Sequence, residues 1–331
     1  MAGLQNLPRL KTCFLYDILQ FISLEMARFL LRRFLDSLWV LFLLGTLTFF
    51  MARFVPGGPF DQECNLSQTT LQNLAQFYGY DKPLYQQYFD YFRHLIKGDL
   101  GPSMRYSGHS VNQLLRESIP VSLELGFWAM LVSLLLGGTC GIVCSIYHDR
   151  FLDKFLMLLC LFCLSLPTFV LGPIIIWFFV LKLNYGQAIG WETWSDRILP
   201  VLTLACMYSG YIARLMRTSC LDVLHQPFIK TAYAKGLSRF RVLFFHVLKN
   251  ALSPVLTYLG PATAAIMSGS LVIESLFQIP GAGSLFISAV TQRDTSLLLG
   301  TVLYFAFLIL LMNFLVDIAV GFCNPKQRLK S

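Results

Sequence analysis

Six long apolar runs constrain this chain more than any other feature of its sequence. They cover residues 34–54, 121–147, 155–181, 198–216, 251–277 and 297–322. A helix needs about 20 residues to cross a bilayer, so six transmembrane helices could form. The composition agrees, because 56% of the residues are hydrophobic and only 13% are charged, whereas about a quarter of a soluble domain is charged. The sequence therefore predicts an all-α, polytopic membrane protein with six transmembrane helices.

The positions of lysine and arginine predict how these helices are oriented. Of the 26 such residues, 17 fall in four segments on one side of the predicted membrane, at 1–33, 148–154, 214–250 and 323–331. Because lysine and arginine concentrate on the cytoplasmic side, both termini are predicted to be cytoplasmic. This asymmetry also explains the net charge of +8, so nucleic acid is not an expected partner.

This orientation divides the chain into parts. Residues 1–33 form a cytoplasmic segment, in which 1–25 are a candidate extension because Met26 begins a stretch that resembles a complete start. The other parts are the first transmembrane helix (34–54), an external loop region (55–120), a transmembrane core (121–322) with a cytoplasmic loop at 217–250, and a cytoplasmic tail (323–331).

The external loops carry local signals of their own. Short helices are expected at 66–78 and 84–96, and a Pro-Gly turn in IPGAGSLFISAV precedes an apolar helix too short to span. Trp191 and Trp194 are placed where aromatic side chains anchor a protein at the membrane interface.

The cytoplasmic stretch 228–254 differs from the rest of the apolar chain because it is basic and rich in small residues. Pro227 suits a first helical turn, Gly236 suits the position after a helix, and Ser238 can cap the next one. Apolar residues then recur with helical spacing, which predicts one buried face. That predicted face comprises Phe240, Leu243, Phe244, Val247, Leu248 and Ala251.

The opposite face is predicted to expose Val242 and Phe245 among basic and polar residues, which favours a protein partner. The small residues Ala232, Ala234 and Gly236 would allow that partner to approach closely. Two alternatives remain at this point. The segment could be an amphipathic helix on anionic lipid, or a helix-turn-helix DNA reader, although the adjacent membrane spans leave little room for a duplex.

The same stretch resembles the cytoplasmic EAA loop of ABC importer membrane subunits, whose pattern is E-A-A-x3-G-x9-I-x-L-P. Lys230, Thr231 and Ala232 occupy its first places and Gly236 falls at the required spacing. His246, Leu248 and Lys249 fill its end, with Lys230, His246 and Lys249 departing from the pattern. The variant TAxAKGL followed by HxLKxAxxPV is similar to that of dipeptide, oligopeptide and nickel importers.

Other stretches of residues 26–328 are similar to the same subfamily. They include VPGGPFD and KGDLGPS in the external region, ARLMRTSCLDVL before the loop and GSLVIESLFQIPGAGSLFISAV near the end. The resemblance implies a type I ABC importer permease fold in a bacterial cytoplasmic membrane. It also implies alternating access and a coupling loop. The residues expected in the loop are Lys230, Thr231, Ala232, Ala234, Lys235, Gly236, Arg241, Val242, Phe245, His246 and Lys249.

The resemblance further implies partners: a second homologous permease, two cytosolic ATPase subunits, an extracytoplasmic solute-binding protein and the membrane lipid. ATP and Mg²⁺ are expected on the ATPase subunits, because a phosphate-binding loop needs Gly-Lys and that dipeptide does not occur here. No catalytic or metal-binding motif is found in the sequence either. The CxxC of Cys160 and Cys163 lies in an apolar run, where cysteine acts as a small hydrophobe.

Polar residues within the runs are candidates for the transport pathway or a gate. They are Tyr208, Ser209, Tyr211, Glu274 and Asn313. Each could instead join helices by hydrogen bonds, and Glu274 could equally bind its own turn. The alternative function is an ion- or proton-coupled secondary transporter, which the span count permits. The absence of internal sequence repeats disfavours it, and a membrane enzyme ranks third.

Overall fold

The computed structural model describes residues 7–54, 73, 76–106, 108–184, 187, 189–267 and 270–323. Within these ranges the chain is helical, with one isolated bridge between Pro102 and Ser110 and no strand. Five helical segments are long and apolar enough to span a membrane, and a sixth span arises if one bent pair counts as a single crossing. The predicted all-α architecture is confirmed. Of the predicted 66–78 helix, only residues 73 and 76–78 are among the described residues.

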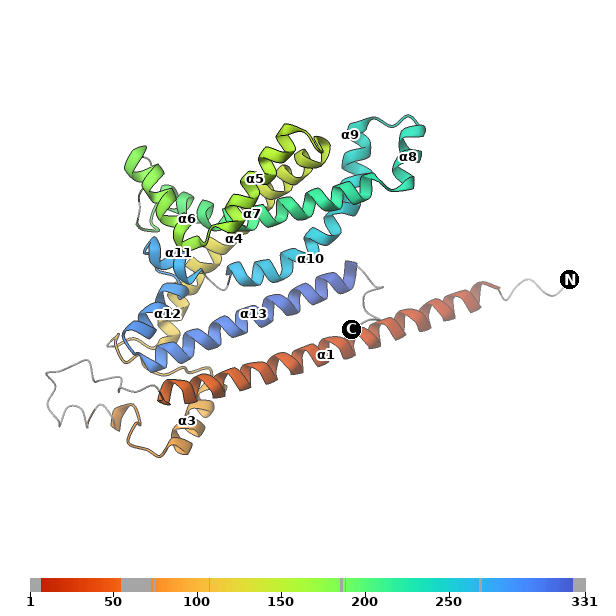
Figure 1. Ribbon diagram of the computed structural model, residues 1–331. Helices are drawn as coiled ribbons and strands as arrows, with labels where there is room; N and C mark the ends of the chain where they lie inside the picture. The colour runs from red at the N-terminus through yellow and green to blue at the C-terminus, as the bar shows by residue number, and fades with distance from the viewer. Residues whose placement is uncertain are drawn as a thin grey trace.

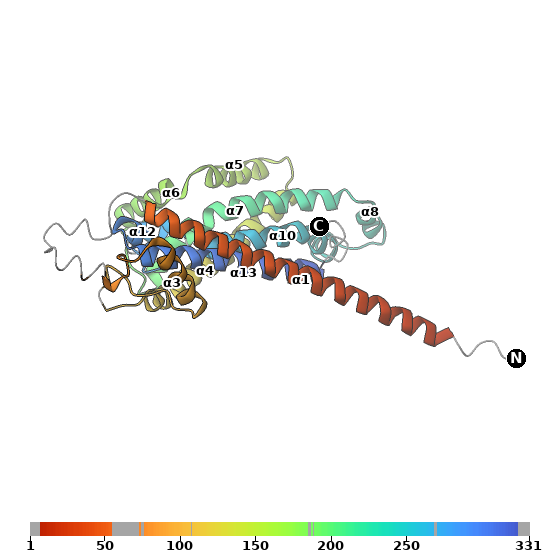
Figure 2. The same cartoon turned by 90° about the horizontal axis from the view of Figure 1, so that it is seen from below.

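The first span belongs to α1 (Leu7–Phe54), of which 31–54 is apolar enough to cross a membrane. Helix α1 runs beside α13 (Thr295–Cys323), and its N-terminal part extends away from the other helices (Figures 1 and 2). Helix α3 (Leu84–Ile96) coincides with the predicted helix 84–96. It packs aromatic residues against α1, with the Tyr88 and Phe49 ring centroids 5.5 Å apart.

Helices α4 (Val111–Ile146) and α7 (Trp194–Leu224) form the most extensive helix pair of the bundle. The start of α4 precedes the apolar run by ten residues, because the Ser110 side chain accepts a hydrogen bond from the Gln113 N–H and caps the helix. Small residues bring the pair together. A Cβ on Gly137 or Gly141 would lie 2.5 Å from a carbonyl oxygen of α7, so only glycine permits this approach.

The third predicted span, 155–181, is not one straight helix. Helix α5 (Phe151–Ser165) is followed by α6 (Thr168–Ile175) and the π-helix η1 (Ile176–Lys182), and the two parts are bent by 110°. Pro167 accounts for the break, because the residue before a proline is forced out of helical geometry. Leu166 is accordingly extended, with ψ of 122°.

The remaining helices complete the bundle and its loops. They are α8 (Pro227–Ala234), α9 (Arg239–Arg241), the π-helix η2 (Val242–Val247), α10 (Leu248–Met267), α11 (Leu271–Leu276) and α12 (Ala282–Thr291). Helix α12 is the short apolar helix that the sequence predicts after its Pro-Gly turn. In the described part of the chain, three clusters of buried side chains lie along the bundle, and the smallest of them contains Val111 and Leu297. The other two are larger. One surrounds Leu199 and Phe277, and the other surrounds Met216 and Val242.

Candidate functional site

The predicted coupling loop, residues 217–250, begins inside α7, which continues to Leu224. The rest of the loop folds as α8, followed by α9 and η2, at one end of the bundle (Figure 1). Pro227 starts α8, as the sequence predicts. Gly236 has φ of +80°, a conformation in which a side chain would be strained. Ser238 then accepts a hydrogen bond from the Arg241 N–H and caps the next helix. These three local predictions are confirmed.

The predicted helical face after Ser238 is wrong in part. Val242 is completely buried, whereas Phe240 is 68% exposed and Phe244 is 46% exposed. The cause is η2, because a π-helix bonds residues five apart and inserts one extra residue into its turn. Val242 and Val247, five residues apart, therefore share the buried face, and Ala251 and Val255 continue it four residues at a time.

The loop exposes a surface of aromatic and basic side chains, which we call the aromatic–basic surface. Its aromatic members are Phe228, Tyr233, Phe240, Phe244 and Phe245, and its basic members are Lys230, Lys235, Arg239, Arg241 and Lys249. Between residues 227 and 250 the sequence has no acidic residue. Exposed aromatic rings together with arginine are typical of protein–protein interfaces.

Buried side chains join this surface to the membrane bundle. Ile229 and Ala232 of α8 pack in one cluster with Val242, Val247 and Met216, the last of which lies on α7. Ala232 was expected at the partner surface, but it is only 7% exposed and packs inward instead. Because protein cores are close-packed, this cluster brings α8 into direct contact with the cores of α7 and α10.

The candidate pathway residues do not share one environment. The ring of Tyr211 on α7 contacts the ring of Tyr258 on α10 in a tilted arrangement, with ring centroids 4.2 Å apart. Tyr208 packs against the cluster around Leu199. The Ser209 hydroxyl donates to the Cys206 carbonyl oxygen of its own helix at 2.8 Å. Asn313 is half-buried on α13. A pathway role for these residues stays a prediction.

Glu274 lies in α11, ahead of the turn that leads into α12, and is completely buried. Its carboxylate accepts hydrogen bonds from the Ser122 hydroxyl at 2.9 Å and from the backbone N–H groups of Gly283 at 2.8 Å and Ser284 at 3.2 Å. The carboxylate thus ties the start of α12 to α4. These contacts favour the second role considered for Glu274, that of holding its own turn.

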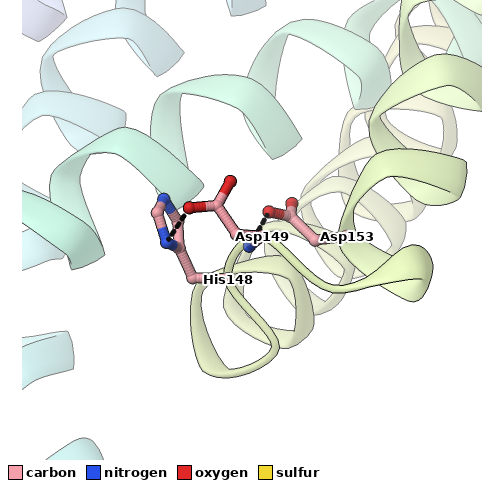
Figure 3. A group of neighbouring side chains, drawn as sticks. All are labelled: His148, Asp149 and Asp153. Atoms are coloured by element: carbon pink, nitrogen blue, oxygen red, sulfur yellow. Dashed lines mark hydrogen bonds and ion pairs between the residues drawn. The ribbon is translucent and has the colours of Figure 1, made fainter.

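His148, Asp149 and Asp153 bring potential metal ligands within 4.8 Å of one another near the start of α5 (Figure 3). Both carboxylate oxygens of Asp153, however, accept hydrogen bonds from the Arg217 guanidinium of α7 at 2.7 Å. One of them also accepts a hydrogen bond from the Asp149 N–H at 3.0 Å. The arrangement suits a helix-joining ion pair better than a metal centre.

At the opposite end of α7, sequence reasoning missed a second ion pair. Arg197 donates to Glu124 of α4 at 2.6 Å and lies over the Trp194 ring. Trp194 is exposed, as predicted for an interfacial anchor, but Trp191 is buried and contributes to the core. Glu124 and Arg197 are 73 residues apart in sequence, and nothing in their local sequences indicates that they meet.

The family described as binding-protein-dependent transport system inner membrane component matches residues 133–329, and its N-terminal companion matches residues 26–126. The chain is 41% identical to the oligopeptide transport system permease protein OppB of Haemophilus influenzae, over 92% of this chain and 100% of that protein. It is 38% identical to the dipeptide transport system permease protein DppB of Bacillus subtilis, over 92% of this chain and 99% of that protein.

Solved structures are similar in fold. An inward-facing structure of the MetNI methionine ABC transporter aligns with a TM-score of 0.51 and 16% identity, over 62% of this chain and 94% of the other. An amino acid ABC transporter structure determined with histidines aligns with a TM-score of 0.50 and 15% identity, over 62% of this chain and 92% of the other. At these identities the likeness concerns the fold alone.

Proposed function

The chain belongs to the family of binding-protein-dependent transport system inner membrane components, and from this premise we propose how it works. It is a multi-pass permease subunit of a peptide ABC importer in the bacterial inner membrane. As such it is a transport component that operates together with ATPase subunits. The ABC importer function takes the place of the alternative function, that of an ion- or proton-coupled secondary transporter.

The proposed assembly contains a second, homologous permease subunit, two cytosolic ATPase subunits and an extracytoplasmic solute-binding protein. Membrane lipid surrounds the bundle, and nucleic acid is not a partner. ATP and Mg²⁺ bind to the ATPase subunits, and this chain binds neither. Both termini and the loop 217–250 face the cytoplasm, in agreement with the distribution of lysine and arginine.

One observation carries the coupling mechanism: the aromatic–basic surface is continuous through Ile229 and Val242 with the core of α7 and α10. An ATPase subunit that binds this surface pushes on α8. Because α8 shares buried contacts with the spans, closure of the ATPase pair favours one arrangement of the bundle over the other. Nucleotide shifts that equilibrium only by its differential affinity for the two states.

The experiment is co-purification of the ATPase subunits with wild-type chain and with Phe245→Glu. Phe245 is 68% exposed, so the substitution leaves the core intact and places a negative charge within the proposed interface. We expect normal membrane insertion and loss of the bound ATPase. Phe77→Glu is the matched control, because Phe77 is 73% exposed in the predicted external region and should not affect ATPase binding.

Two results would contradict the proposal. Wild-type chain could fail to retain any ATPase, or Phe245→Glu could retain as much ATPase as Phe77→Glu does. Either would show that the aromatic–basic surface is not the docking surface, and the lipid-binding interpretation of the loop would then be favoured.

A further inference from the structure

A polar pocket of about 420 Å³ lies beside the C-terminal end of α1, away from the aromatic–basic surface. Its walls come from α1, α3, the segment 99–104 and the start of α13. Arg53 of α1 forms one wall, with its guanidinium 3.9 Å from the centroid of the Tyr80 ring. Gln87 and Tyr91 of α3 line the pocket as well. Its volume falls within the range of small-molecule sites.

Polar atoms in these walls lack hydrogen-bond partners. They are Nε and Nη1 of Arg53, Oε1 of Gln87 and the hydroxyl of Tyr91. Each of these atoms is buried, and a buried polar atom without a hydrogen-bond partner costs free energy. The Gln87 side-chain nitrogen is held by the Lys82 carbonyl oxygen at 2.7 Å, which fixes the acceptor Oε1 as the free atom of that amide.

The Arg53 guanidinium is hydrogen-bonded to the Tyr80 side chain, but no carboxylate of the described residues compensates its charge. Asp90 and Asp99 line the pocket, but Asp90 pairs with Lys82 at 2.7 Å and Asp99 pairs with His94 at 3.3 Å. Among the described residues, no carboxylate forms an ion pair with Arg53. A buried, unpaired charge is costly, so the pocket is complementary to a ligand that brings an anion to Arg53 and a hydrogen-bond donor to Gln87.

An apolar groove of about 1370 Å³ lies next to this pocket, and Leu100 lines both. The groove is formed by α1, α3, α4 and α13, and its walls include Leu38, Phe92 and Leu303. The hydroxyl of Tyr304, another lining residue, is a further buried polar atom without a partner.

The two cavities follow one another along the same membrane-spanning helices. On α1 the pocket is lined at residues 49 and 53 and the groove at 35–42. On α13 the pocket is lined at 295–299 and the groove at 300–307. Both helices therefore place the polar pocket near the membrane surface and the apolar groove toward its middle, which is the order of headgroup and acyl chains in a lipid.

We propose that the polar pocket and the apolar groove together bind one phospholipid whose headgroup carries an amine. The lipid phosphate pairs with Arg53, the headgroup ammonium donates to Oε1 of Gln87, and the acyl chains fill the groove. An ester carbonyl of the lipid accepts the hydrogen bond that Tyr304 otherwise lacks. This lipid would bind whether or not the aromatic–basic surface binds an ATPase subunit.

A phospholipid with an amine headgroup differs from free phosphate and from a quaternary ammonium lipid in the contacts that it can make here. Free phosphate would satisfy Arg53 but would leave the groove open to other apolar molecules. A lipid with a quaternary ammonium headgroup has no N–H to donate, so it would leave Gln87 Oε1 unpaired. A hydrogen bond to a charged group contributes enough to change affinity by about tenfold or more, which makes both differences measurable.

The test is native mass spectrometry of the full chain, purified from bacterial membranes in detergent and titrated with short-chain phosphatidylethanolamine. Parallel titrations use short-chain phosphatidylcholine and inorganic phosphate. We expect saturable binding of one phosphatidylethanolamine, about tenfold weaker binding of phosphatidylcholine, and no displacement of the lipid by phosphate. Arg53→Gln should weaken lipid binding at least tenfold, whereas Arg93→Gln, an exposed arginine of α3 that lines neither cavity, should not.

Two further variants separate binding from folding. Gln87→Leu should abolish the preference for phosphatidylethanolamine over phosphatidylcholine while the chain stays folded, as judged by circular dichroism. Leu38→Trp fills the groove and should weaken both lipids, whereas Leu47→Trp, on an equally exposed leucine of α1 outside the groove, should not.

Three outcomes would overturn the proposal. Wild type could show no saturable lipid binding, inorganic phosphate could compete with the lipid, or a folded Gln87→Leu chain could keep the full headgroup preference. Competition by phosphate would mean that the pocket binds anions and does not recognise the headgroup amine or the acyl chains of a lipid.

Discussion

Glu274 holds a turn in place with a carboxylate that receives three hydrogen bonds inside the protein. Gly281 and Gly283 make this possible, because a Cβ at either position would collide with the Glu274 side chain. The carboxylate therefore lies directly against the backbone at the start of α12. The backbone N–H groups that donate hydrogen bonds to this carboxylate explain why an ionisable residue occurs in this apolar stretch of sequence.

Replacing Glu274 by alanine should destabilise the protein markedly. The N–H groups of Gly283 and Ser284 and the hydroxyl of Ser122 would lose their acceptor, at about 1–3 kcal/mol for each buried group left unsatisfied. We expect a clear fall in the midpoint of thermal unfolding in detergent, with Glu274→Gln intermediate. Glu117→Ala, at an exposed position of α4, is the control, and an equal effect of both alanine variants would show that the buried carboxylate is not important.

Val242 and Phe245 should differ sharply in how much stability they lose on the same substitution. Val242→Asp buries an unpaired carboxylate among Met216, Ile229 and Val247, which should cost roughly 3 kcal/mol or more. Phe245→Asp changes an exposed side chain and should leave the unfolding midpoint nearly unchanged. The measurement is thermal unfolding of both purified variants. Equal stability of the two would mean that the helix is not in the π register described above.

Helices α4 and α7 depend on glycine where they cross. A Cβ on Gly141 would lie 2.5 Å from the Ala213 carbonyl oxygen and 2.7 Å from the Met216 Cβ. Close approach through small residues is the main way in which transmembrane helices associate.

Gly141→Ala should therefore force α4 and α7 apart and lower the unfolding midpoint, with an overpacking cost of about 1–3 kcal/mol. Gly138→Ala is a matched control on the same helix, because an added Cβ there meets nothing within 4 Å. Alanine is also the better helix former, so Gly138→Ala should be neutral or slightly stabilising. If both variants are equally stable, the contact between the two helices is not tight at Gly141.

Several secondary-structure elements agree with what the sequence patterns predict. The 84–96 helix was predicted at its observed bounds, and the turn at Gly236 and the cap at Ser238 were found where their residue types indicate. These features depend on local backbone chemistry, which is visible in a short stretch of sequence. The six apolar runs likewise predict the membrane-spanning helices, because hydropathy depends on composition alone.

Other elements could not be predicted because they depend on packing. The π-helix at Val242–Val247 has no distinct residue pattern, so a regular helical period placed Phe240 and Phe244 on the wrong face. The 110° bend at Pro167 was hidden within one apolar run. The pairs Arg217–Asp153 and Arg197–Glu124 join residues 64 and 73 positions apart, and only the fold brings them together.

For the whole molecule, α5 and α7 are joined at two levels. The Asp153–Arg217 ion pair joins them at one end of α5, and the Cys163 and Cys206 sulfur atoms lie 2.7 Å apart further along the helices. Between these points the backbones approach closely, because a Cβ on Gly210 would lie 2.6 Å from the Cys160 carbonyl oxygen. We expect these helices to move as one body during transport.

Oxidative cross-linking of Cys163 to Cys206 should therefore leave peptide uptake within about twofold of the reduced protein. The assay uses the complete transporter in proteoliposomes, with cross-linking verified by mass spectrometry of the linked peptides. Cys206→Ser, which cannot form this link, is the control for damage by the oxidant. A loss of uptake that a reductant reverses would show that α5 and α7 move relative to each other.

The contact between α1 and α13 joins the first and the last helices of the chain. A ribosome releases α1 long before α13 exists, so during synthesis α1 faces the bilayer with its inner side uncovered. Both the polar pocket and the apolar groove take walls from these two helices, and neither cavity is complete until α13 has been inserted. A nascent chain truncated before residue 295 would thus insert its earlier spans and still lack both cavities. Both cavities can therefore be completed only near the end of translation.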